Sequence, residues 1–93
     1  MIKFTELTKE EAQIVVKKAN KRDILNSNKF TEKELKGYCS LINIEVKEVS
    51  TEQPNKAWDE SDNLILLQKC TKNLIIIKDG NGKGHYLLIN EEV

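Results

Sequence analysis

Two apolar runs near the C-terminal end of the chain decide the fold: LILLQKC at residues 64–70 and LIIIK at residues 74–78. The three residues between them, TKN at 71–73, favour a tight turn. Short runs rich in Leu and Ile, bounded by turn residues, are typical of central strands that are buried on both faces. The sequence therefore predicts a β-hairpin at the centre of a sheet.

Further strands are predicted on both sides of this hairpin. Downstream, the glycine-rich segment DGNGKG at 79–84 predicts a second hairpin turn, and HYLLI at 85–89 predicts the last strand. Upstream, apolar and charged residues alternate from Ile44 to Val49, which is typical of a strand exposed on one face, with a bulge near Lys47. Together these segments form an antiparallel meander of four strands, and residues 2–4 are a candidate fifth strand.

A first helix is predicted upstream of the meander. Thr8 and Glu11 have the spacing of a capping box, in which each side chain accepts the backbone amide of the other. Behind them, small apolar residues recur with helical spacing at Ala12, Val15, Val16 and Ala19. This pattern predicts a helix from Thr8 to about Lys21.

A second helix follows a break at residues 23–29, a segment that fits either a short strand or a loose turn. Thr31 and Glu34 form another capping box, beside a hydrophobic staple of Phe30 and Leu35. A second apolar stripe with helical spacing consists of Leu35, Tyr38, Cys39 and Ile42. The predicted helix runs from Glu32 to Leu41.

This order of elements predicts an α+β fold in which two N-terminal helices pack on one face of a four- to five-stranded antiparallel meander sheet. Leu64 and Leu66 would point to one face of the sheet, while Ile65 and Leu67 would point to the other. The second face is thus also apolar, so we expect it to be either covered or used for binding.

Composition limits the possible functions. The chain has 93 residues, which suits one compact domain over residues 1–93. Its 15 basic and 15 acidic residues argue against both a basic wrapper of nucleic acid and an acidic mimic of DNA. No apolar run approaches the roughly 18 residues of a membrane span, and the N-terminus does not resemble a signal peptide. We therefore expect a cytoplasmic protein with no membrane association.

The sequence offers little for catalysis or metal binding. His85, the only histidine, has Asp79 across a hairpin mouth but no serine or cysteine placed beside it as a nucleophile. Cys39 and Cys70 lack the Cys-x-x-Cys spacing typical of zinc sites and are expected to be reduced, buried thiols. We expect no enzymatic activity, no cofactor and no metal.

The candidate binding site lies in residues 50–62, the longest segment without periodicity, which we expect to form a loop. It holds the only tryptophan, Trp58, followed by Asp59, Glu60 and Asp62. Trp58 either folds back to cap the core or anchors an interface. These four residues are the predicted contacts of a non-enzymatic binding protein. Its concrete form would be an inhibitor or modulator of phage or mobile-element type that docks on a host protein or defence complex.

Two alternative functions remain open. A basic cluster at the end of the first helix would make the protein a small nucleic-acid-associated regulator; its members are Lys17, Lys18, Lys21 and Arg22. The glycine-rich turn at 79–84 would hold a small ligand or nucleotide if its amides formed an anion site. Homodimerisation through the second sheet face is compatible with each of these functions.

Part of the chain resembles a known inhibitor family. The segment AWDESDN at 57–63, the apolar runs that follow it and the DGNG turn at 79–82 are similar to the C-terminal half of phage uracil-DNA glycosylase inhibitors. That family is strongly acidic and mimics DNA, whereas this chain is neutral and has no acid between Ile24 and Phe30 to match the family's acidic edge strand. The resemblance implies an architecture suited to a small inhibitor.

Overall fold

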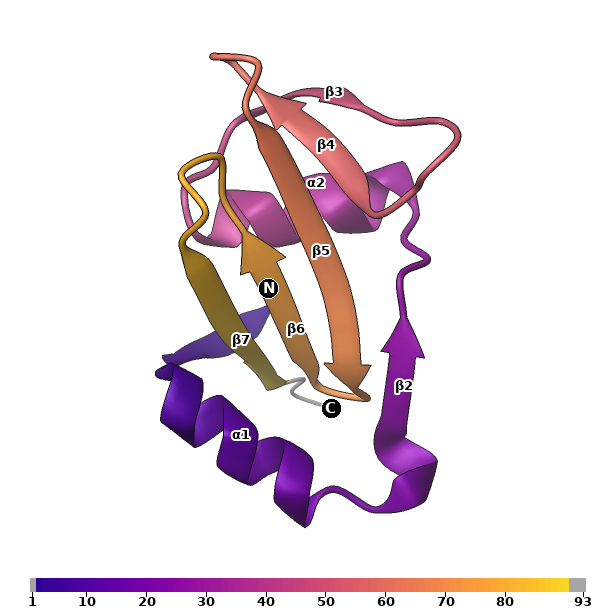
Figure 1. Ribbon diagram of the computed structural model, residues 1–93, viewed down its shortest axis with the longest axis vertical. Coiled ribbons are helices and arrows are strands. Elements are labelled where there is room, and N and C mark those ends of the chain that lie inside the picture. The colour runs from indigo at the N-terminus through magenta and orange to yellow at the C-terminus, as the bar shows by residue number, and fades with distance from the viewer. Residues whose placement is uncertain (1, 91–93) are drawn as a thin grey trace.

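The computed structural model describes residues 2–90 and contains two α-helices, one short 3-10 helix and a seven-stranded antiparallel sheet (Figure 1). The helical elements are α1 (Lys9–Lys18), η1 (Lys21–Asp23) and α2 (Glu32–Leu41). The strands are β1 (Lys3–Leu7), β2 (Ile24–Ser27), β3 (Val46–Val49), β4 (Lys56–Asp59), β5 (Leu64–Thr71), β6 (Leu74–Lys78) and β7 (Gly84–Asn90). The α+β class and the central β5–β6 hairpin are as predicted.

The sheet has more strands than the four or five predicted. Its order is β1-β7-β6-β5-β4-β3, and β2 pairs with the second half of β5, on the same edge as β4 and beyond the first residue of β4. β1 lies alongside β7, so the N-terminal strand closes the far edge of the sheet. The expected loop at 50–62 contains β4, whose Ala57 is fully buried. This strand was missed because its one core residue is an alanine, which adds little apolar signal.

Both capping boxes form as predicted. In α1 the Glu11 amide donates to the Thr8 hydroxyl oxygen over 3.1 Å, and in α2 the Glu34 amide donates to Thr31 over 3.1 Å. α2 has the predicted bounds, but α1 ends at Lys18, before the predicted Lys21. The chain becomes extended at Ala19, the last small residue of the apolar stripe, and Lys21–Asp23 form the 3-10 turn instead.

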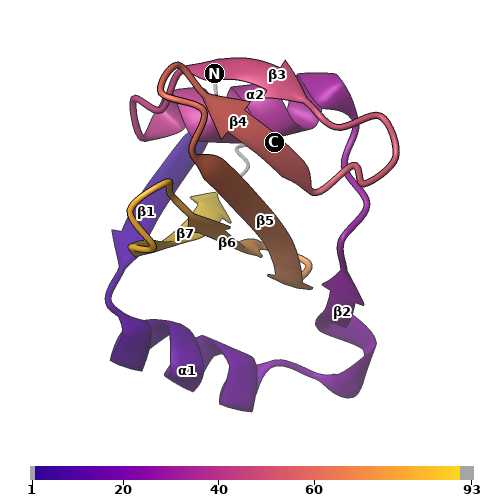
Figure 2. The same cartoon turned by 45° about the horizontal axis from the view of Figure 1, so that its top comes forward.

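The two helices lie on opposite faces of the sheet, which corrects the prediction that they share one face (Figure 2). α2 buries Leu35 and Cys39 in the main core, against strand residues that include Ile65 and Ile77. α1 buries only Ala12 and lies along the other face, near Leu74. Helical periodicity shows that a helix has an apolar stripe, but it does not show which sheet face that stripe covers.

The edge of the sheet beyond β4 contains the predicted irregularity. The register of β3 against β4 shifts between Val46 and Glu48, which places the bulge at Lys47. Because of the extra residue, Val46 and Val49 both pack against the main core although they are three positions apart.

None of the described helices is long and apolar enough to cross a membrane.

Candidate functional site

One sheet face is only half covered, and its uncovered half carries the candidate site. Register and side-chain alternation place three cross-strand rows on this face. The rows are Trp58–Leu64, Lys56–Leu66–Lys78 and Gln68–Ile76–Tyr86. We call these eight residues the open face. α1 lies over the adjoining part of the same side, and Figure 1 shows no helix in front of the upper part of β4, β5 and β6.

Five of the eight residues of the open face are apolar or aromatic, and they are accessible. Leu64 is 40% exposed, and Trp58, Leu66, Ile76 and Tyr86 are half-buried. By contrast, Leu74 lies on the same side beneath α1 and is fully buried. Trp58, Leu64 and Leu66 are not among the residues that line the hollow beside α1, so this half of the open face has no such helical cover.

Two hollows that share Ile76 connect this face to α1. The larger, of about 590 Å³, lies between α1 and the sheet and is lined by Lys9, Ala12, Gln13, Val16, Lys17, Leu74, Ile76 and Tyr86. The smaller, of about 220 Å³, is lined by Asn28, Asn55, Leu66, Leu67, Gln68, Ile76 and Lys78. Ile76 lines both hollows, so they adjoin at this side chain, and we call their combined lining the groove.

The groove is positively charged. Its linings include Lys9, Lys17 and Lys78, but no aspartate or glutamate. Lys56 is the cross-strand neighbour of Leu66, so it is a fourth lysine beside the groove. Within the part of the chain that the structure describes, none of these four lysines forms an ion pair. Their charges are therefore available to a negatively charged partner.

Trp58, predicted to lie in a loop, lies on β4. It is the cross-strand partner of Leu64, and its neighbour Ala57 points to the main core. Since alternate residues of a strand point to opposite faces, the indole lies on the open face and not in the main core. The lone tryptophan is thus a half-buried member of an apolar row.

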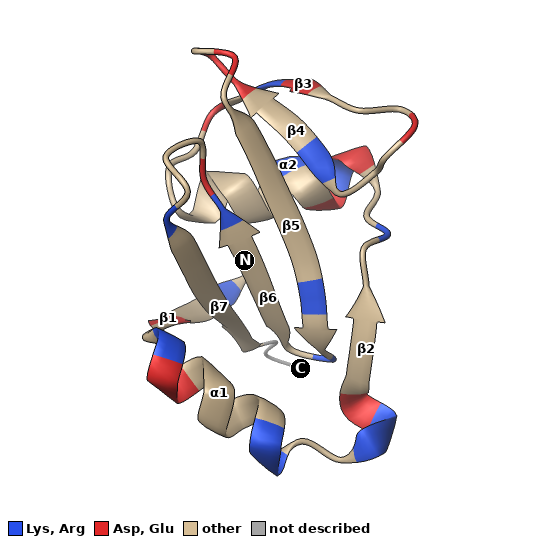
Figure 3. Ribbon diagram, viewed as in Figure 1, with Lys and Arg blue, Asp and Glu red and all other residues tan. Residues whose placement is uncertain are grey.

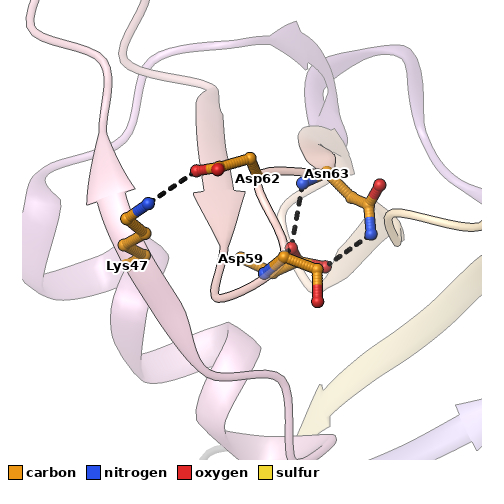
Figure 4. A network of polar contacts seen from close by, with 5 residues as sticks. Lys47, Asp59, Asp62 and Asn63 are labelled. Atoms are coloured by element: carbon orange, nitrogen blue, oxygen red, sulfur yellow. Dashed lines mark hydrogen bonds and ion pairs between the residues drawn. The ribbon is translucent and has the colours of Figure 1, made fainter.

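The acids predicted to accompany Trp58 lie at one end of the sheet, in the β4–β5 turn. Asp59 accepts hydrogen bonds from the backbone amides of Ser61 and Asn63 over 2.8 and 2.9 Å, so its carboxylate holds the turn together (Figure 4). Asp62 has a positive φ of 61° and accepts a hydrogen bond from Lys47 Nζ over 2.7 Å. This hydrogen bond raises the pKa of Lys47 above its ordinary value. Glu60 is exposed.

The β6–β7 turn repeats this construction. Asp79 accepts from the amides of Asn81 and Lys83 over 2.8 and 3.0 Å, and Gly82, with φ of 80°, takes the place of Asp62. The Gly82 amide donates to the Asp79 carbonyl over 3.0 Å. These three amides are occupied within the turn, so they do not form the anion site considered for a phosphate or nucleotide.

His85 joins the second turn to β1. Its Nε2 lies 3.0 Å from Asp79 Oδ2, and its Nδ1 lies 3.7 Å from Glu6 Oε1. The hydrogen bond with His85 is the main reason that the pKa of Asp79 is lowered, and the turn amides add to the effect. No serine, threonine or cysteine among residues 2–90 hydrogen-bonds His85, so these contacts do not assemble a nucleophile.

The basic cluster lies at the end of α1 and in η1, where Figure 3 shows neighbouring basic segments. Its four members are all exposed: Lys17, Lys18, Lys21 and Arg22. Lys17 also lines the larger hollow of the groove. The basic cluster and the lining of the groove thus share one residue, Lys17.

The remaining candidate ligands are separated. Cys39 and Cys70 are both free, the first on α2 and the second on β5. Burial raises the pKa of Cys39 to about 11 and also raises that of Cys70. Within residues 2–90, no group of three or more His, Cys, Asp or Glu side chains is arranged to hold a metal ion.

No protein-family model matches the chain, and no curated protein or solved structure matches it. Its function is therefore inferred from the site geometry. Sequence patterns identified Trp58 as unusual because it is the only tryptophan. They did not connect it with Leu66, Ile76 and Tyr86, since only the sheet register brings these residues together. The alternation from Leu64 to Leu67 was the one signal of a second apolar face.

Proposed function

We propose that this protein is a non-enzymatic binding module that docks on another protein through the open face. The observation that supports this proposal is the uncovered apolar centre of the sheet, with Leu64 40% exposed beside Trp58. Contiguous apolar surface of this kind on a small protein is typical of an interaction site. A centre of aromatic and aliphatic side chains with a charged rim is also the usual composition of an interface that is buried on binding.

The proposed form of this activity is that of a small inhibitor or modulator, of the type encoded by phages or mobile elements, acting on a host protein or defence complex. Trp58 would be the anchor. Glu60 and Asp62 lie just beyond the Trp58–Leu64 row, in the turn that connects the two strands, where they would form the rim of the contact. Asp59 would act indirectly, since its carboxylate shapes that turn.

The proposal is tested by capturing partners from a lysate of the source organism or its host and identifying them by mass spectrometry. The baits are the wild-type protein, Trp58→Ala, Leu64→Lys and the control Ile14→Lys. Ile14 is 51% exposed on α1 and lies outside the groove lining, so the control adds the same charge at another exposed apolar position. We expect wild type and control to retain a shared partner that both open-face variants lose.

Stability measurements make this test decisive. Because Trp58 is half-buried, we expect Trp58→Ala to cost about 1–3 kcal/mol of unfolding free energy, less than a full core deletion. Leu64→Lys, at an exposed position, should change stability by less than about 1 kcal/mol. If both variants stay folded and bind the partner as wild type does, the open face is not the docking surface.

The basic cluster supports a second candidate function, contact with nucleic acid. Its four side chains are exposed, and none of them forms an ion pair with a described residue. Binding through lysine and arginine would weaken steeply with salt, the logarithm of affinity falling by about 0.9 per phosphate contact for each unit of log salt. Fluorescence anisotropy with duplex DNA at low salt tests it, with Lys21→Glu/Arg22→Glu as the variant. An absent signal at low salt would rule this function out.

A further inference from the structure

The open face also indicates what kind of segment it binds, an inference that rests on the proposed docking function. We propose that its occupant is an acidic amphipathic helix of another protein, lying in the groove beside α1 with its apolar stripe on Leu66, Ile76 and Tyr86. Three properties of the face lead to this assignment: its fully paired main chain, the helical cover on neighbouring parts of the sheet, and the sign of its charge.

The main chain of the open face is not available to a partner. β6 pairs with β5 and β7, and β5 pairs with β6 on one edge and with β4 and β2 on the other. A partner strand therefore cannot be added at this place, because the peptide groups of β5 and β6 already bond within the sheet. The face presents only side chains, which is the surface on which helices pack.

The fold already uses helices to cover this sheet. α2 covers one face, and α1 covers the part of the other face that includes Leu74. α1 directs one side of its surface into the groove through Lys9, Ala12, Gln13, Val16 and Lys17, a set with the i, i+3, i+4, i+7, i+8 spacing of a single helical face. A partner helix placed alongside would contact this face of α1 and complete the layer that α1 begins.

Charge complementarity identifies the partner as acidic. Lys56 and Lys78 are on either side of Leu66 in one cross-strand row, and Lys9 and Lys17 line the groove on the α1 side. The apolar strip is thus bordered by lysines on two sides, and its linings contain no carboxylate. A matching partner helix has Leu, Ile or Phe at i, i+3, i+4 and i+7, flanked by Asp and Glu. Its apolar residues would be buried on the apolar strip, and its acids would pair with the lysines.

The same charges disfavour the other occupants. A second copy docked face to face would bring two sets of these lysines together, and like charges at an interface oppose association. Glu60 and Asp62 lie outside the groove, in the turn after β4, so they do not offset the charge of the lysines that line it. A nucleic acid would find lysines, but the centre of the groove is mainly aliphatic, with Leu66, Ile76 and Val16, rather than a platform of stacked aromatic rings.

The probe is a designed amphipathic peptide of 18 residues. It has Leu at positions i, i+3, i+4 and i+7, which form one face of the helix, and Glu at the positions on both sides of that face. Its matched control has Lys in place of every Glu. Trp58 is the only tryptophan and lies in the row next to Leu66, so its emission monitors the open face, and amide shifts in ¹⁵N-labelled protein locate the contact. We expect the acidic peptide to bind with shifts centred on Leu66 and Ile76, and the basic peptide not to bind.

Charge reversal provides the second arm. Lys78→Glu, in the groove, is compared with Lys33→Glu, an exposed residue of α2 on the opposite side of the sheet. We expect Lys78→Glu to weaken the acidic peptide about five- to tenfold at low salt, with a smaller effect at high salt, and Lys33→Glu to change affinity less than about twofold. Both substitutions lie at exposed positions, so both variants should fold.

Four outcomes would overturn the inference: equal binding of both peptides, equal effects of the two reversals, a concentration-dependent dimer whose shifts map to the open face, and a single-stranded oligonucleotide that binds there more tightly than the acidic peptide.

The docking function is tested separately, by the capture of cellular partners. If Leu64→Lys loses a cellular partner while the acidic peptide fails to bind, docking stands and the acidic helix does not. If Leu64→Lys retains every partner, the docking function itself fails.

Discussion

Gly80, in the turn between β6 and β7, lies directly against Asn63, in the turn between β4 and β5. A Cβ atom at Gly80 would be 2.3 Å from Asn63 Cβ and 2.8 Å from Asp59 Oδ2. Both turns are closed by an aspartate that accepts two amides of its own turn, and they lie at the same end of the sheet. The absence of a side chain at Gly80 allows two rigid turns to pack as one unit beside Trp58.

This contact predicts that Gly80→Ala is destabilising. The new methyl group would overlap Asn63, and the turn could accept it only by moving away from the Asp59 turn. We expect a loss of about 1–3 kcal/mol in unfolding free energy, measured by urea denaturation.

The matched control is Gly37→Ala. Gly37 lies inside α2, and a Cβ atom there would have no heavy atom within 4 Å. Since alanine favours the helix over glycine, we expect a gain of about 0.5–1 kcal/mol. Replacing glycine with alanine would thus lower the unfolding free energy at position 80 and raise it at position 37. A stabilising Gly80→Ala would show that the two turns do not pack as described.

Sequence patterns predicted the elements whose signals are local. The capping box, the staple and the apolar stripe of α2 all lie between Phe30 and Ile42, and this helix has its predicted bounds. The β5–β6 hairpin was equally clear, because its apolar runs need no partner to be recognised. By contrast, β4 and β1 have weak apolar patterns of their own. β4 pairs with β5 and β1 pairs with β7, and these partner strands carry the apolar runs. For β1, the partner strand is also distant in sequence.

The side of the sheet that each helix covers, and hence the site, was not predictable for a related reason. Val15 and Val16 form a stripe that suits either face, and β1 places α1 at the far edge of the sheet, from which it returns over the second face. That arrangement leaves half of the face open. Trp58 was singled out by its rarity, whereas Lys56 and Lys78 gain meaning only from the row they share with Leu66.

The two thiols should differ in reactivity. Cys39 is fully buried and its pKa is raised to about 11, while Cys70 is only half-buried. Because the thiolate is the reactive form, Cys39 in the Cys70→Ala variant should react with a disulfide reagent at pH 8 no faster than the protein unfolds. Cys70 in the Cys39→Ala variant should react faster, measured by absorbance. Equal native-state rates would show that Cys39 is accessible.

Acid should weaken the fold through Asp79. Its pKa is lowered from 3.8, mainly by the hydrogen bond with His85, so the ionised form is favoured in the folded state. The stability that this provides is present above the unfolded pKa and is lost as the pH falls through the lower folded pKa. We expect Asp79→Asn to be less stable than wild type at pH 7 and the difference to shrink below pH 3.8, measured by urea denaturation across pH.

Glu52→Gln is the control for this pH dependence. Glu52 is exposed and has no hydrogen-bond partner among the described residues, so the substitution should leave the urea midpoint unchanged at pH 7. A difference between wild type and Asp79→Asn that stays constant from pH 7 to acid would mean that the carboxylate charge at position 79 contributes nothing, and that only turn geometry is affected.

The two capping threonines should report different kinds of stability. Thr31→Ala and Thr8→Ala each remove a hydroxyl that accepts a first-turn amide, a loss of about 1 kcal/mol for the helix concerned. α2 contributes Leu35 and Cys39 to the main core, so its loss should appear in full in global unfolding. α1 buries only Ala12, so Thr8→Ala should mainly increase local opening, measured as faster amide exchange within α1.

The consequence extends to the groove, because α1 forms one of its sides through Val16 and Lys17. Thr8→Ala should weaken the acidic peptide by an amount that matches the extra opening of α1, whereas Thr31→Ala should leave affinity unchanged as long as the protein is folded. Equal global destabilisation by both variants would show that α1 unfolds only together with the sheet. In that case the affinity should follow global stability alone, and the side of the groove formed by α1 would be as rigid as the strands beneath it.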